Sequence, residues 1–330
     1  CGPDLLYEVW REVHARYGPG RLLPVAAVAH WSYGPSFLYE RMSHEMRTEL
    51  LGGLMVGTLT SCFAMSEPDA GSDGWAMSTR ARLEDDEWVI NGTKQWITNS
   101  PEADCVFVWA VTNNDLRRER RGGISCFVVP SDTPGCSVDS VISLFGQNGG
   151  HEGIVSFTDV RVPRGALVGE IDRGFILAME GVSTGRLYNA ARCVGMAQWA
   201  IDQASQYAGD RQAFGQRIGD YQGVSFQLAD CAVEVYAADM MSRDCAQRLA
   251  DGRWSDDHVA MVKIFTTETC FRVYDRCMQV LGGMGLTNEM RLTAGWHQAR
   301  IVRIADGSAE ILRRNVGRAL VKGRLKAKEL

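Results

Sequence analysis

The spacing of hydrophobic residues changes twice along the chain, and this change constrains the fold more than any other feature of the sequence. Residues 1–60 show apolar side chains at intervals of three and four, which is the period of helices. Residues 61–170 hold short β-rich runs divided by turn residues, and residues 171–330 return to long stretches of helical spacing. The sequence therefore predicts an α+β protein, with an N-terminal helical domain, a middle antiparallel β-domain and a C-terminal four-helix bundle.

Turn residues and apolar runs locate individual elements. Asn91-Gly92 separates the β-rich runs 88–90 and 93–98, and this pair is a strong signal for a tight hairpin. Gly282-Gly283 is expected to end a long C-terminal helix. The middle region favours an antiparallel barrel or sandwich of short strands. Helices are expected over 5–13, 23–30 and 44–55, strands over 106–111, 124–129, 154–157 and 160–163, and a turn over 132–135.

Composition and charge exclude several classes of protein. Of the 330 residues, 45% are hydrophobic and 23% are charged, which is ordinary for a globular protein. The net charge of −5 gives no basic excess for nucleic acid or an anionic membrane, and no apolar run is long enough to span a bilayer. The one basic run, 313–328, is interpreted as the solvated face of a last helix. The ten cysteines form no CxxC pair, so we expect small buried side chains in a reducing compartment and no metal site.

Two segments of the middle region suit a planar cofactor. A loop with Gly71 and Ser72 follows the strand at Phe63 and exposes backbone N–H groups and small hydroxyls, which suit a polar heterocycle or a phosphate. Trp96 and Thr98 alternate onto one face of a strand, where an aromatic ring and a hydroxyl suit a flavin. Each segment also has an ordinary structural explanation, the first as a tight strand-to-loop turn and the second as a pair in the core.

Three segments of the C-terminal region carry further candidate residues. Arg211 and Phe214 combine a phosphate-binding side chain with an aromatic surface, or else mark a helix end with an exposed Arg. Gly282-Gly283 permits the backbone to approach a ligand closely, or else forms a simple helix C-cap; it does not follow a strand as a dinucleotide-binding GxGxxG does. Asp306 lies in an apolar setting before Gly307-Ser308, as a base of raised pKa or as the N-cap of the next helix.

The combination of these motifs, in this order, resembles the acyl-CoA dehydrogenase superfamily from about Asp4 to the C-terminus. The resemblance implies a helical N-terminal domain, a middle β-domain and a C-terminal four-helix bundle, with FAD as the cofactor and a homo-oligomer, a dimer or a tetramer, as the assembly. The motifs are E-P-x-A-G-S-D at 67–73, W-I-T-N at 96–99, R-x-x-F-G-x-x-I at 211–218, Q-V-L-G-G-x-G at 279–285 and the acid-Gly-Ser block at 306–308.

The resemblance also implies roles for individual residues. The flavin and the substrate entrance would be lined by Phe63, Met65, Ser66, Gly71 and Ser72. The isoalloxazine ring would be contacted by Trp96 and Thr98, and Ser308 and Glu310 would lie near the cofactor. The ADP half of an FAD bound to a neighbouring subunit would be held by Arg211, Phe214, Gln279, Gly282 and Gly283. The acyl-CoA would be bound by Ser72, Ser183 and Arg186, the last of these near the CoA moiety.

The reaction that the resemblance implies is α,β-dehydrogenation of an acyl-CoA thioester, as in fatty-acid β-oxidation. The thioester carbonyl accepts hydrogen bonds from a ribityl hydroxyl of the flavin and from the backbone N–H of the catalytic acid, which stabilises enolate character. A carboxylate, here Asp306, removes the α-proton while the β-hydride moves to flavin N5. The electrons are then expected to pass to an electron-transfer flavoprotein.

Two departures from the family pattern affect these expectations. The family base is usually Glu at the position of Asp306, and Asp is one methylene shorter. Some relatives carry the base just before the equivalent of Arg186, but that residue is Gly185 here, so Asp306 is the candidate at either location and Glu180 is the next carboxylate to consider. The N-terminal helical domain, 1–60, is expected to be partial, because the sequence begins inside the first domain of the family.

Two other functions stay open at this point. Nitroalkane oxidase, a flavin oxidase of the same superfamily, uses Asp as its base, so an oxidase of that type is one alternative. The other is an FAD-binding subunit of a heteromeric dehydrogenase that has little activity alone, with a second chain supplying the early helices. We expect a cytoplasmic bacterial protein, or a protein of the mitochondrial matrix if a preceding segment carried a transit peptide. The sequence gives no acyl chain length.

Overall fold

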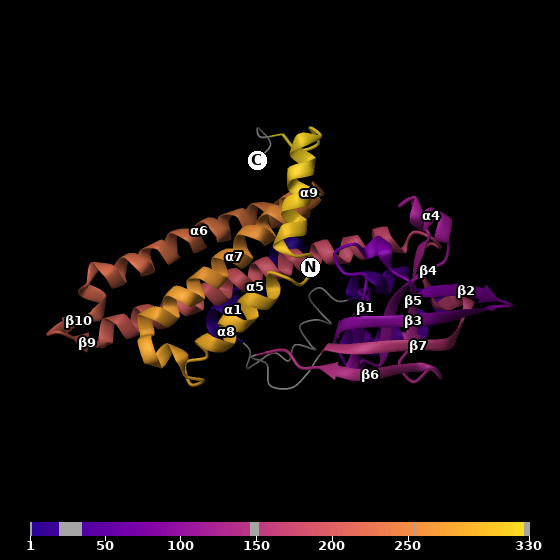
Figure 1. Cartoon of the computed structure of the whole chain (residues 1–330), viewed down its shortest axis with the longest axis horizontal. Coiled ribbons are helices and arrows are strands. Elements are labelled where there is room, and N and C mark those ends of the chain that lie inside the picture. Colours follow the sequence, from indigo (N-terminus) through magenta and orange to yellow (C-terminus); the bar gives the residue numbers. More distant parts are fainter. Residues whose placement is uncertain (1, 20–34, 146–151, 254, 327–330) are drawn as a thin grey trace. The chain divides into compact units, whose positions relative to one another are not determined.

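A computed structural model of the chain describes residues 2–19, 35–145, 152–253 and 255–326 (Figure 1). These residues form two compact units, each described here by itself. The sheet unit comprises residues 23–184, and the helical unit comprises residues 1–22 and 185–330. Residues 1–60 are thus divided between the two units, and the domain boundaries expected from the sequence stay predictions. The helix expected over 23–30 lies outside the described residues.

The sheet unit is built on eight strands in one sheet, in the order β6-β7-β3-β2-β4-β5-β8, with β1 beside β4. In Figure 1, β6, β7 and β3 run next to one another. The strands are β1 (Ser61–Ala64), β2 (Arg80–Glu84), β3 (Glu87–Thr98), β4 (Cys105–Val111), β5 (Ile124–Pro130), β6 (Cys136–Ile142), β7 (Glu152–Pro163) and β8 (Leu167–Val168). Its helical segments are η2 (Pro35–Arg41), α3 (His44–Val56), η3 (Gly74–Ala76), η4 (Ser100–Glu102), α4 (Asn114–Arg118) and η5 (Arg164–Ala166).

The sheet has an apolar core on each of its faces, because its central strands are apolar throughout. Along β4, Phe107 and Trp109 belong to a core cluster that includes residues of η2, α3 and the start of α5. Val106 and Val108 belong to a second cluster, with residues of β3 and β7. The strands expected over 106–111 and 124–129 and the helix expected over 44–55 are therefore confirmed, with small differences at their ends.

The hairpin expected at Asn91-Gly92 is wrong, because β3 runs without interruption through these residues. The tight turn lies earlier, at Asp85 and Asp86 between β2 and β3, where Asp85 has a φ of 55°. Gly92 instead occupies a register shift between β3 and β7, at a φ of 150°. A Cβ there would lie 2.6 Å from the Thr79 Cα, so close backbone approach explains the glycine.

The sequence predicted a purely antiparallel sheet, and this prediction is wrong. β1 pairs with β4 in parallel over its full length, and β2 makes a parallel contact with β4 between Arg80 and Val111. The remaining pairings named in the sheet order are antiparallel. Parallel pairing requires a long connection, and the chain between β1 and β4 supplies it.

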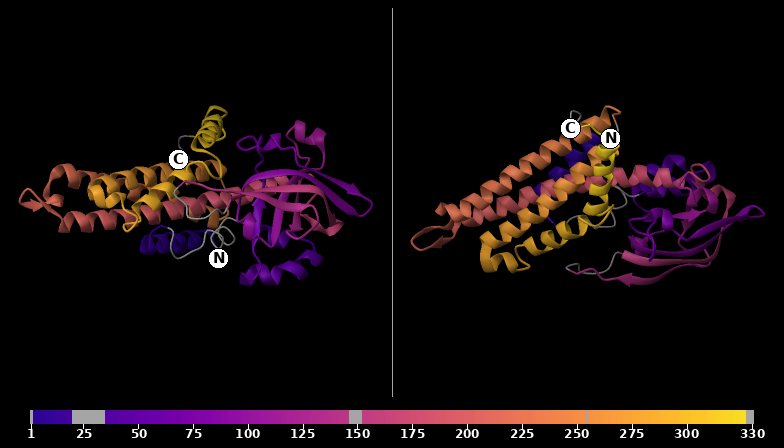
Figure 2. Two further views of the ribbon diagram at one scale, coloured as in Figure 1. Left: turned by 60° about the horizontal axis from the view of Figure 1, so that its bottom comes forward. Right: turned by 45° about the horizontal axis from the view of Figure 1, so that its top comes forward.

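The helical unit is a bundle whose long helices run side by side in both views of Figure 2. Its elements are α1 (Pro3–Tyr17), α5 (Gly174–Asp210, which begins in the sheet unit), β9 (Gln212–Ala213), β10 (Gln216–Arg217), η6 (Ile218–Asp220), α6 (Gln222–Ala250), α7 (Asp256–Leu281), η7 (Gly282–Leu286), α8 (Leu292–Val302) and α9 (Ala309–Val321). One core cluster joins α5, α6, α7 and α8 around Trp199, Val235 and Tyr274. The bundle and the helix end at Gly282 are confirmed.

Helix α1 packs on α6 within the helical unit. The Tyr7 hydroxyl donates a hydrogen bond of 2.9 Å to Asp239 Oδ1, and both side chains are buried. At the other end of α1, Gly18 has a φ of 67°, and a Cβ there would collide with the Trp199 ring. The first helix therefore belongs physically to the bundle that holds the C-terminal motifs.

Candidate active site

Asp306 lies in the short turn between α8 and α9. Asp306 and Gly307 both have left-handed backbone conformations, with φ of 55° and 96°. A non-glycine residue in this region is uncommon and is held there by its surroundings. Ser308, and not Asp306, is the N-cap of α9, because its Oγ accepts a hydrogen bond of 3.4 Å from Ile311 N. The interpretation of Asp306 as a helix cap is therefore wrong.

The Asp306 carboxylate is oriented by one side chain of α5. Asn189 Nδ2 donates a hydrogen bond of 2.7 Å to Asp306 Oδ2, and Asn189 is itself 3% exposed. Burial raises the pKa of the Asp306 carboxyl above its ordinary value, while the cations Lys263 and Arg186 and the hydrogen bond from Asn189 act against this rise. A carboxylate of raised pKa beside a polar partner has the character of a general base.

Two cations hold the backbone of this turn from within the bundle. Lys263, on α7, donates hydrogen bonds of 2.6 Å to the carbonyl oxygens of Ala305 and Gly307. Arg186, on α5, donates from Nε to the carbonyl oxygen of Asp306 at 2.9 Å. Burial lowers the pKa of Lys263 to about 8, against the attraction of Asp306. Three successive carbonyl groups are thus bound by two cations, the buried Lys263 and the half-buried Arg186.

The candidate residues of α5 and of the first turn of α9 differ in exposure. Ser183, three residues before Arg186 on α5, is 1% exposed. Gly185, the alternative family location of the base, is buried on the same helix. Glu180 is half-exposed and lies 3.6 Å from Arg41 within the sheet unit. Glu310 is exposed in the first turn of α9, where its charge suits the helix N-terminus. The roles of these residues stay predictions.

In the sheet unit, the segment after β1 is joined to β3 at the predicted flavin residues. The backbone N–H of Gln95 donates a hydrogen bond of 2.9 Å to the carbonyl oxygen of Ser66. Lys94 Nζ donates to the carbonyl oxygen of Met65 at 3.0 Å and to Glu67 Oε1 at 2.9 Å. The structure therefore brings Met65 and Ser66 close to the strand that carries Trp96.

The Lys94–Glu67 ion pair is buried, with side-chain exposures of 0% and 3%. Glu67 also accepts hydrogen bonds from the backbone N–H groups of Ser78 and Thr79, at 2.6 and 3.0 Å. Against the effect of burial, Lys94 lowers the pKa of Glu67 to about 2, whereas burial lowers the pKa of Lys94 to about 8. Both groups are charged at neutral pH, and together they fix the turn that leads into Gly71.

Trp96 lies at a bulge in β3, where the register with β7 shifts between Lys94 and Ile97. It has a φ of 64° and is 53% exposed, although it is a large aromatic residue. Ile97 is buried, and Thr98 is half-buried. Bulges of this kind redirect a side chain and are common beside active sites. The exposure of Trp96 argues against the alternative of a core pair, and its contact with a flavin stays a prediction.

The remaining candidates of the sheet unit are Phe63, on β1, and Gly71 and Ser72, in the loop that follows it. Phe63 packs against Trp109, with ring centroids 4.1 Å apart. Gly71 and Ser72 are exposed in the loop after the turn formed by Glu67 and Ala70, and a Cβ on Gly71 would meet no atom within 4 Å. The loop therefore leaves space beside an exposed backbone, as a ligand-binding loop does.

The candidates Arg211, Phe214, Gln279, Gly282 and Gly283 are exposed. Phe214 and Gly215 form the turn of the β9–β10 hairpin, and Phe214 is 98% exposed. Gly282 is the C-cap of α7, and its N–H donates to the carbonyl oxygen of Gln279. In Figures 1 and 2 the hairpin and the end of α7 lie toward the same end of the helical unit, away from the start of α9.

The two groups of candidates in the helical unit do not meet within one chain. Residues 186 and 210 both belong to α5, and a rise of about 1.5 Å per residue separates them by roughly 36 Å. Arg211 follows the end of this helix directly, whereas Arg186 contacts the Asp306 turn. The structure thus brings Asp306 together with Arg186 and leaves Arg211 at a distance.

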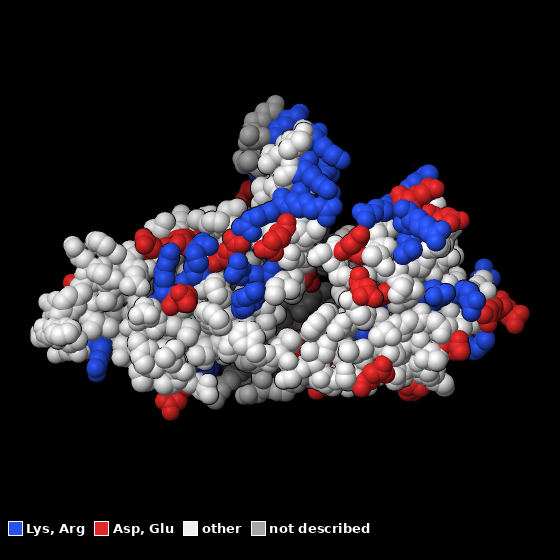
Figure 3. Space-filling view, in the orientation of Figure 1, with Lys and Arg blue, Asp and Glu red and all other residues white. Residues whose placement is uncertain are grey.

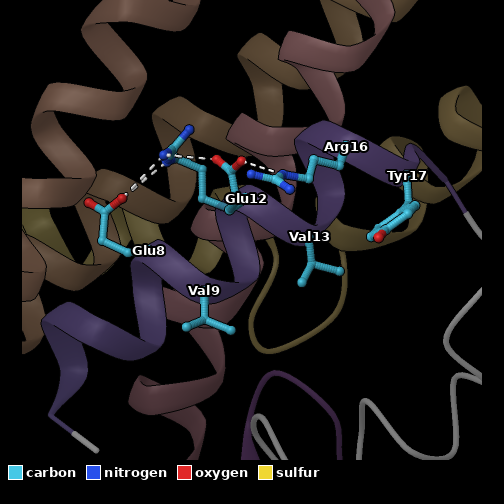
Figure 4. Close-up of a pocket in the computed structure, with 7 residues that line it drawn as sticks. Glu8, Val9, Glu12, Val13, Arg16 and Tyr17 are labelled. Atoms are coloured by element: carbon cyan, nitrogen blue, oxygen red, sulfur yellow. Dashed lines mark hydrogen bonds and ion pairs between the residues drawn. The ribbon is translucent and has the colours of Figure 1, made fainter.

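A shallow hollow of about 480 Å³ lies along one helix, α1, and none of the candidate residues lines it (Figure 4). In Figure 4, Glu8, Glu12 and Arg16 are joined in a chain of ion pairs, while Val9 and Val13 point away from it. Arg11 completes this chain, 3.2 Å from Glu8. The charged side chains that line the hollow are thus paired with one another.

Basic residues gather along α9 in Figure 3, and others are scattered over the rest of this face. Arg314, Arg318 and Lys322 are exposed there, as expected for the basic run of the sequence, and Arg313 pairs with Glu268 at 2.7 Å. In the described part of the chain, no three His, Cys, Asp or Glu side chains are placed to hold a metal ion. Among the described helices, none combines the length and the apolar character that crossing a membrane requires.

Sequence reasoning missed three residues that shape these sites. Asn189 and Lys263 contact the Asp306 turn, and Lys94 pairs with Glu67. A signal was available for Lys263, since a lysine at a core position of a helix requires a specific partner. Asn189 follows Arg186 by three residues, which is one helical turn, and so shares its face of α5.

Comparison with known proteins gives one consistent family. The model of the acyl-CoA dehydrogenase middle domain matches residues 62–160, and the model of the acyl-CoA dehydrogenase C-terminal domain matches residues 172–321. The mitochondrial short-chain specific acyl-CoA dehydrogenase of Homo sapiens is 38% identical over 78% of this chain and 62% of its own length. The probable acyl-CoA dehydrogenase YngJ of Bacillus subtilis is 35% identical over 94% of this chain and 80% of its own length.

The fold agrees with these matches. A crystal structure of an acyl-CoA dehydrogenase from Geobacillus kaustophilus superposes with a TM-score of 0.90 at 28% identity, over 97% of this chain and 83% of that one. The matched part of this chain spans less than two thirds of the length of the human relative. The fold class expected from the sequence is therefore confirmed, with the corrections to the sheet given above.

Proposed function

The chain belongs to the acyl-CoA dehydrogenase family, and we propose that it is an FAD-dependent enzyme that oxidises the Cα–Cβ bond of an acyl-CoA thioester, with Asp306 as the base. The observation that supports this role most strongly is the environment of Asp306. Its carboxylate is half-buried, has a raised pKa and is held by Asn189, while Ser308 performs the capping role at α9. The carboxylate is thus free to accept a proton.

The residues of the sheet unit fit a flavin. An exposed indole at Trp96 stands with the half-buried hydroxyls of Ser66 and Thr98 beside an open Gly71 loop, a set that matches an aromatic ring with polar edges. Trp96, Thr98, Ser66 and Gly71 would therefore hold the isoalloxazine ring of FAD. When bound, the flavin supplies the acceptor for the β-hydride.

The work of the chain itself is positioning and proton transfer. Asp306 accepts the α-proton, and Asn189 keeps its carboxylate in one orientation. Among the described residues, none accepts a hydrogen bond from the backbone N–H of Asp306, so this donor is available to a thioester oxygen. A donor at that oxygen stabilises the enolate that forms as the proton leaves.

The distance between the two groups of candidates supports the proposal of a homo-oligomer. Arg211 lies roughly 36 Å along α5 from Arg186, and Gln279 lies roughly 24 Å along α7 from Lys263, so they would serve an FAD bound mainly by a second copy. Helix α6 also exposes a row of large apolar side chains that a second copy would cover. Their exposed fractions are 59% for Phe226, 69% for Val233, 70% for Tyr236 and 41% for Met240.

An electron-transfer flavoprotein is the proposed electron acceptor. A relative from Acetobacterium woodii, 29% identical over 97% of this chain, is named as the caffeyl-CoA reductase-Etf complex subunit CarC. By that name the relative assembles with an electron-transfer flavoprotein. The same type of partner would reoxidise the flavin of this chain after each turnover.

Anaerobic titration of the FAD-loaded protein with a panel of CoA thioesters tests the proposed function. Bleaching of the flavin by at least one thioester, with slow reoxidation by oxygen, is the expected result. Bleaching by nitroalkanes with rapid reoxidation would identify the oxidase alternative. FAD binding without bleaching by any compound would favour the alternative of a partner subunit.

A further inference from the structure

Lys263 is fully buried but lies within 4 Å of no carboxylate in the described part of the chain. It occupies α7 between Val262 and Thr266, which are buried core residues. A buried ammonium group is costly unless specific acceptors compensate for the lost water. Its acceptors are two backbone carbonyls, those of Ala305 and Gly307, at 2.6 Å each.

The direction of these carbonyls fixes the direction of the amide groups that follow them. A trans peptide is planar, so its C=O and N–H bonds point in opposite directions. Because the Ala305 carbonyl points at Lys263, the N–H of Asp306 points away from Lys263. In the same way, the direction of the Gly307 carbonyl fixes the direction of the Ser308 N–H. Arg186 holds the carbonyl between them.

The charge on Lys263 also affects the strength of the Asp306 donor. A cation on the carbonyl side of a peptide polarises the group, and its N–H then becomes a better hydrogen-bond donor. The left-handed backbone of Asp306 and Gly307 is unfavourable by itself, so the two contacts from Lys263 also stabilise this conformation. Direction, strength and conformation of the donor therefore all depend on one side chain.

We infer that Lys263 is a positioning residue of the proposed reaction, which aims and polarises the Asp306 N–H toward the thioester oxygen and so makes the α-proton more acidic. This inference rests on the proposed function. Lys263 touches neither the substrate nor the flavin in this account. It acts through the peptide group that joins Ala305 to Asp306.

The test compares Lys263→Met with a control on the same helix. Lys263→Met keeps an unbranched apolar side chain and removes both hydrogen bonds. Tyr274→Phe removes a buried donor of α7 whose partner is the carbonyl oxygen of Met196, at 3.1 Å, away from the turn. Any effect that follows merely from losing a buried hydrogen bond to a main-chain carbonyl will appear in both variants.

The first measurement follows α-proton acidity without hydride transfer. A 3-thia-acyl-CoA carries sulfur at its β-position, so it can lose an α-proton but has no β-hydride to give. The rate of α-deuterium uptake from D2O by this ligand, bound to the FAD-loaded protein, should fall about 10²-fold in Lys263→Met, as expected for a lost oxyanion donor. Ligand affinity should change little, and Tyr274→Phe should exchange at the wild-type rate.

The second measurement needs neither cofactor nor ligand. Amide hydrogen exchange in a peptide covering 303–310 should become at least about tenfold faster in Lys263→Met than in the wild type. If Lys263→Met does not fold, Lys263→Gln replaces it, since the amide keeps a donor at shorter reach and should show a smaller loss in both measurements.

Wild-type rates of α-deuterium uptake and of amide exchange in the Lys263 variant would overturn the inference and leave the proposed function intact. A wild-type protein that exchanges no α-proton of any thioester would instead overturn the proposed function. In that case, faster amide exchange in Lys263→Met would still support the role of Lys263 in stabilising the turn. Unchanged amide exchange would reject that role.

Discussion

Asn189 Nδ2 lies 2.7 Å from Asp306 Oδ2, and this hydrogen bond joins the middle of a long helix to the turn that carries the proposed base. The bond favours the charged form of the carboxyl, whereas burial favours the neutral form. The pKa of Asp306 is therefore set by a balance in which Asn189 opposes burial. Changing Asn189 should alter the pH dependence of the reaction before it alters the fold.

Asn189→Leu should move the acidic limb of the pH–rate profile to higher pH. A hydrogen bond to a charged group contributes about 1.5–3 kcal/mol, and about 1.4 kcal/mol corresponds to one pH unit, so a shift of roughly one to two units is expected. The measurement is flavin bleaching by a thioester between pH 5 and 9. Asn91→Leu is the matched control, since Asn91 donates to Asp159 at 3.0 Å in the sheet unit. If the acidic limb of the pH–rate profile stays in place in Asn189→Leu, this hydrogen bond does not control the pKa of Asp306.

Lys94→Met should destabilise the protein by about 3–5 kcal/mol, because it leaves the charge of Glu67 buried without its partner. Urea unfolding of the two proteins at pH 7 measures the difference. The double variant Lys94→Met/Glu67→Leu should recover part of this loss, but not all of it, since the Ser78 and Thr79 N–H groups also lose their acceptor. A loss below 1 kcal/mol in the single variant would contradict this description of the pair.

The same ion pair predicts acid sensitivity. The pKa of Glu67 is about 2 in the folded protein, below the ordinary value of 4.5. A carboxyl whose pKa is lowered by folding contributes stability that is complete above the unfolded pKa and is lost as the pH falls toward the folded one. Stability should therefore decline between about pH 4.5 and 2, and the decline should be smaller in Glu67→Gln. Equal slopes in the two proteins would count against this assignment.

His14 should add a second acid dependence, which begins at a higher pH. Burial lowers its pKa from 6.5 to about 3, and the side chain is 8% exposed beside Trp10 and Tyr188. The unfolded chain binds a proton near pH 6.5 that the folded chain does not, so stability falls as the pH drops from 6.5 toward 3. The contribution approaches about 1.4 kcal/mol per pH unit. Urea unfolding at pH 7 and 5 should show a shallower dependence for His14→Gln than for the wild type.

Arg211→Ala should weaken FAD binding by about 1.5–3 kcal/mol, because it removes a charged contact to a phosphate. Fluorescence titration of the apoprotein with FAD measures this, and circular dichroism should show unchanged helix content. Arg217→Ala is the control, since Arg217 is exposed in the same hairpin and belongs to no predicted contact. Equal FAD affinity in Arg211→Ala and in the wild type would argue against a cofactor shared between copies.

The helices of the bundle could be predicted from the sequence because their apolar residues repeat over many turns. Helical spacing over 171–330 predicted long helices such as α6, and Gly282-Gly283 predicted the end of α7. The hairpin prediction at Asn91-Gly92 failed because this pair occurs at a register shift of β3 as well as in hairpin turns. The real turn at Asp85 gave no glycine signal, since an Asp adopted the left-handed conformation.

The site was predictable only where a motif carried it. Asp306 and Trp96 were found through short motifs, whereas Asn189 and Lys263 were not, because their roles depend on contacts 117 and 42 to 44 residues away in the chain. The choice between base and N-cap for Asp306 also needed the backbone, which places Ser308 at the cap. Local patterns identify the residues of a turn, but its partners come from tertiary packing.

The rate of flavin reduction in Asp306→Asn tests the central claim most directly. The variant keeps the size of the side chain and the backbone N–H, so it should still bind FAD and the acyl-CoA that bleaches the wild type. In a single-turnover stopped-flow experiment its rate of bleaching should fall by about 10²–10⁴-fold, because an amide cannot accept the α-proton. Bleaching at the wild-type rate would contradict the account and leave Glu180 as the next carboxylate to test.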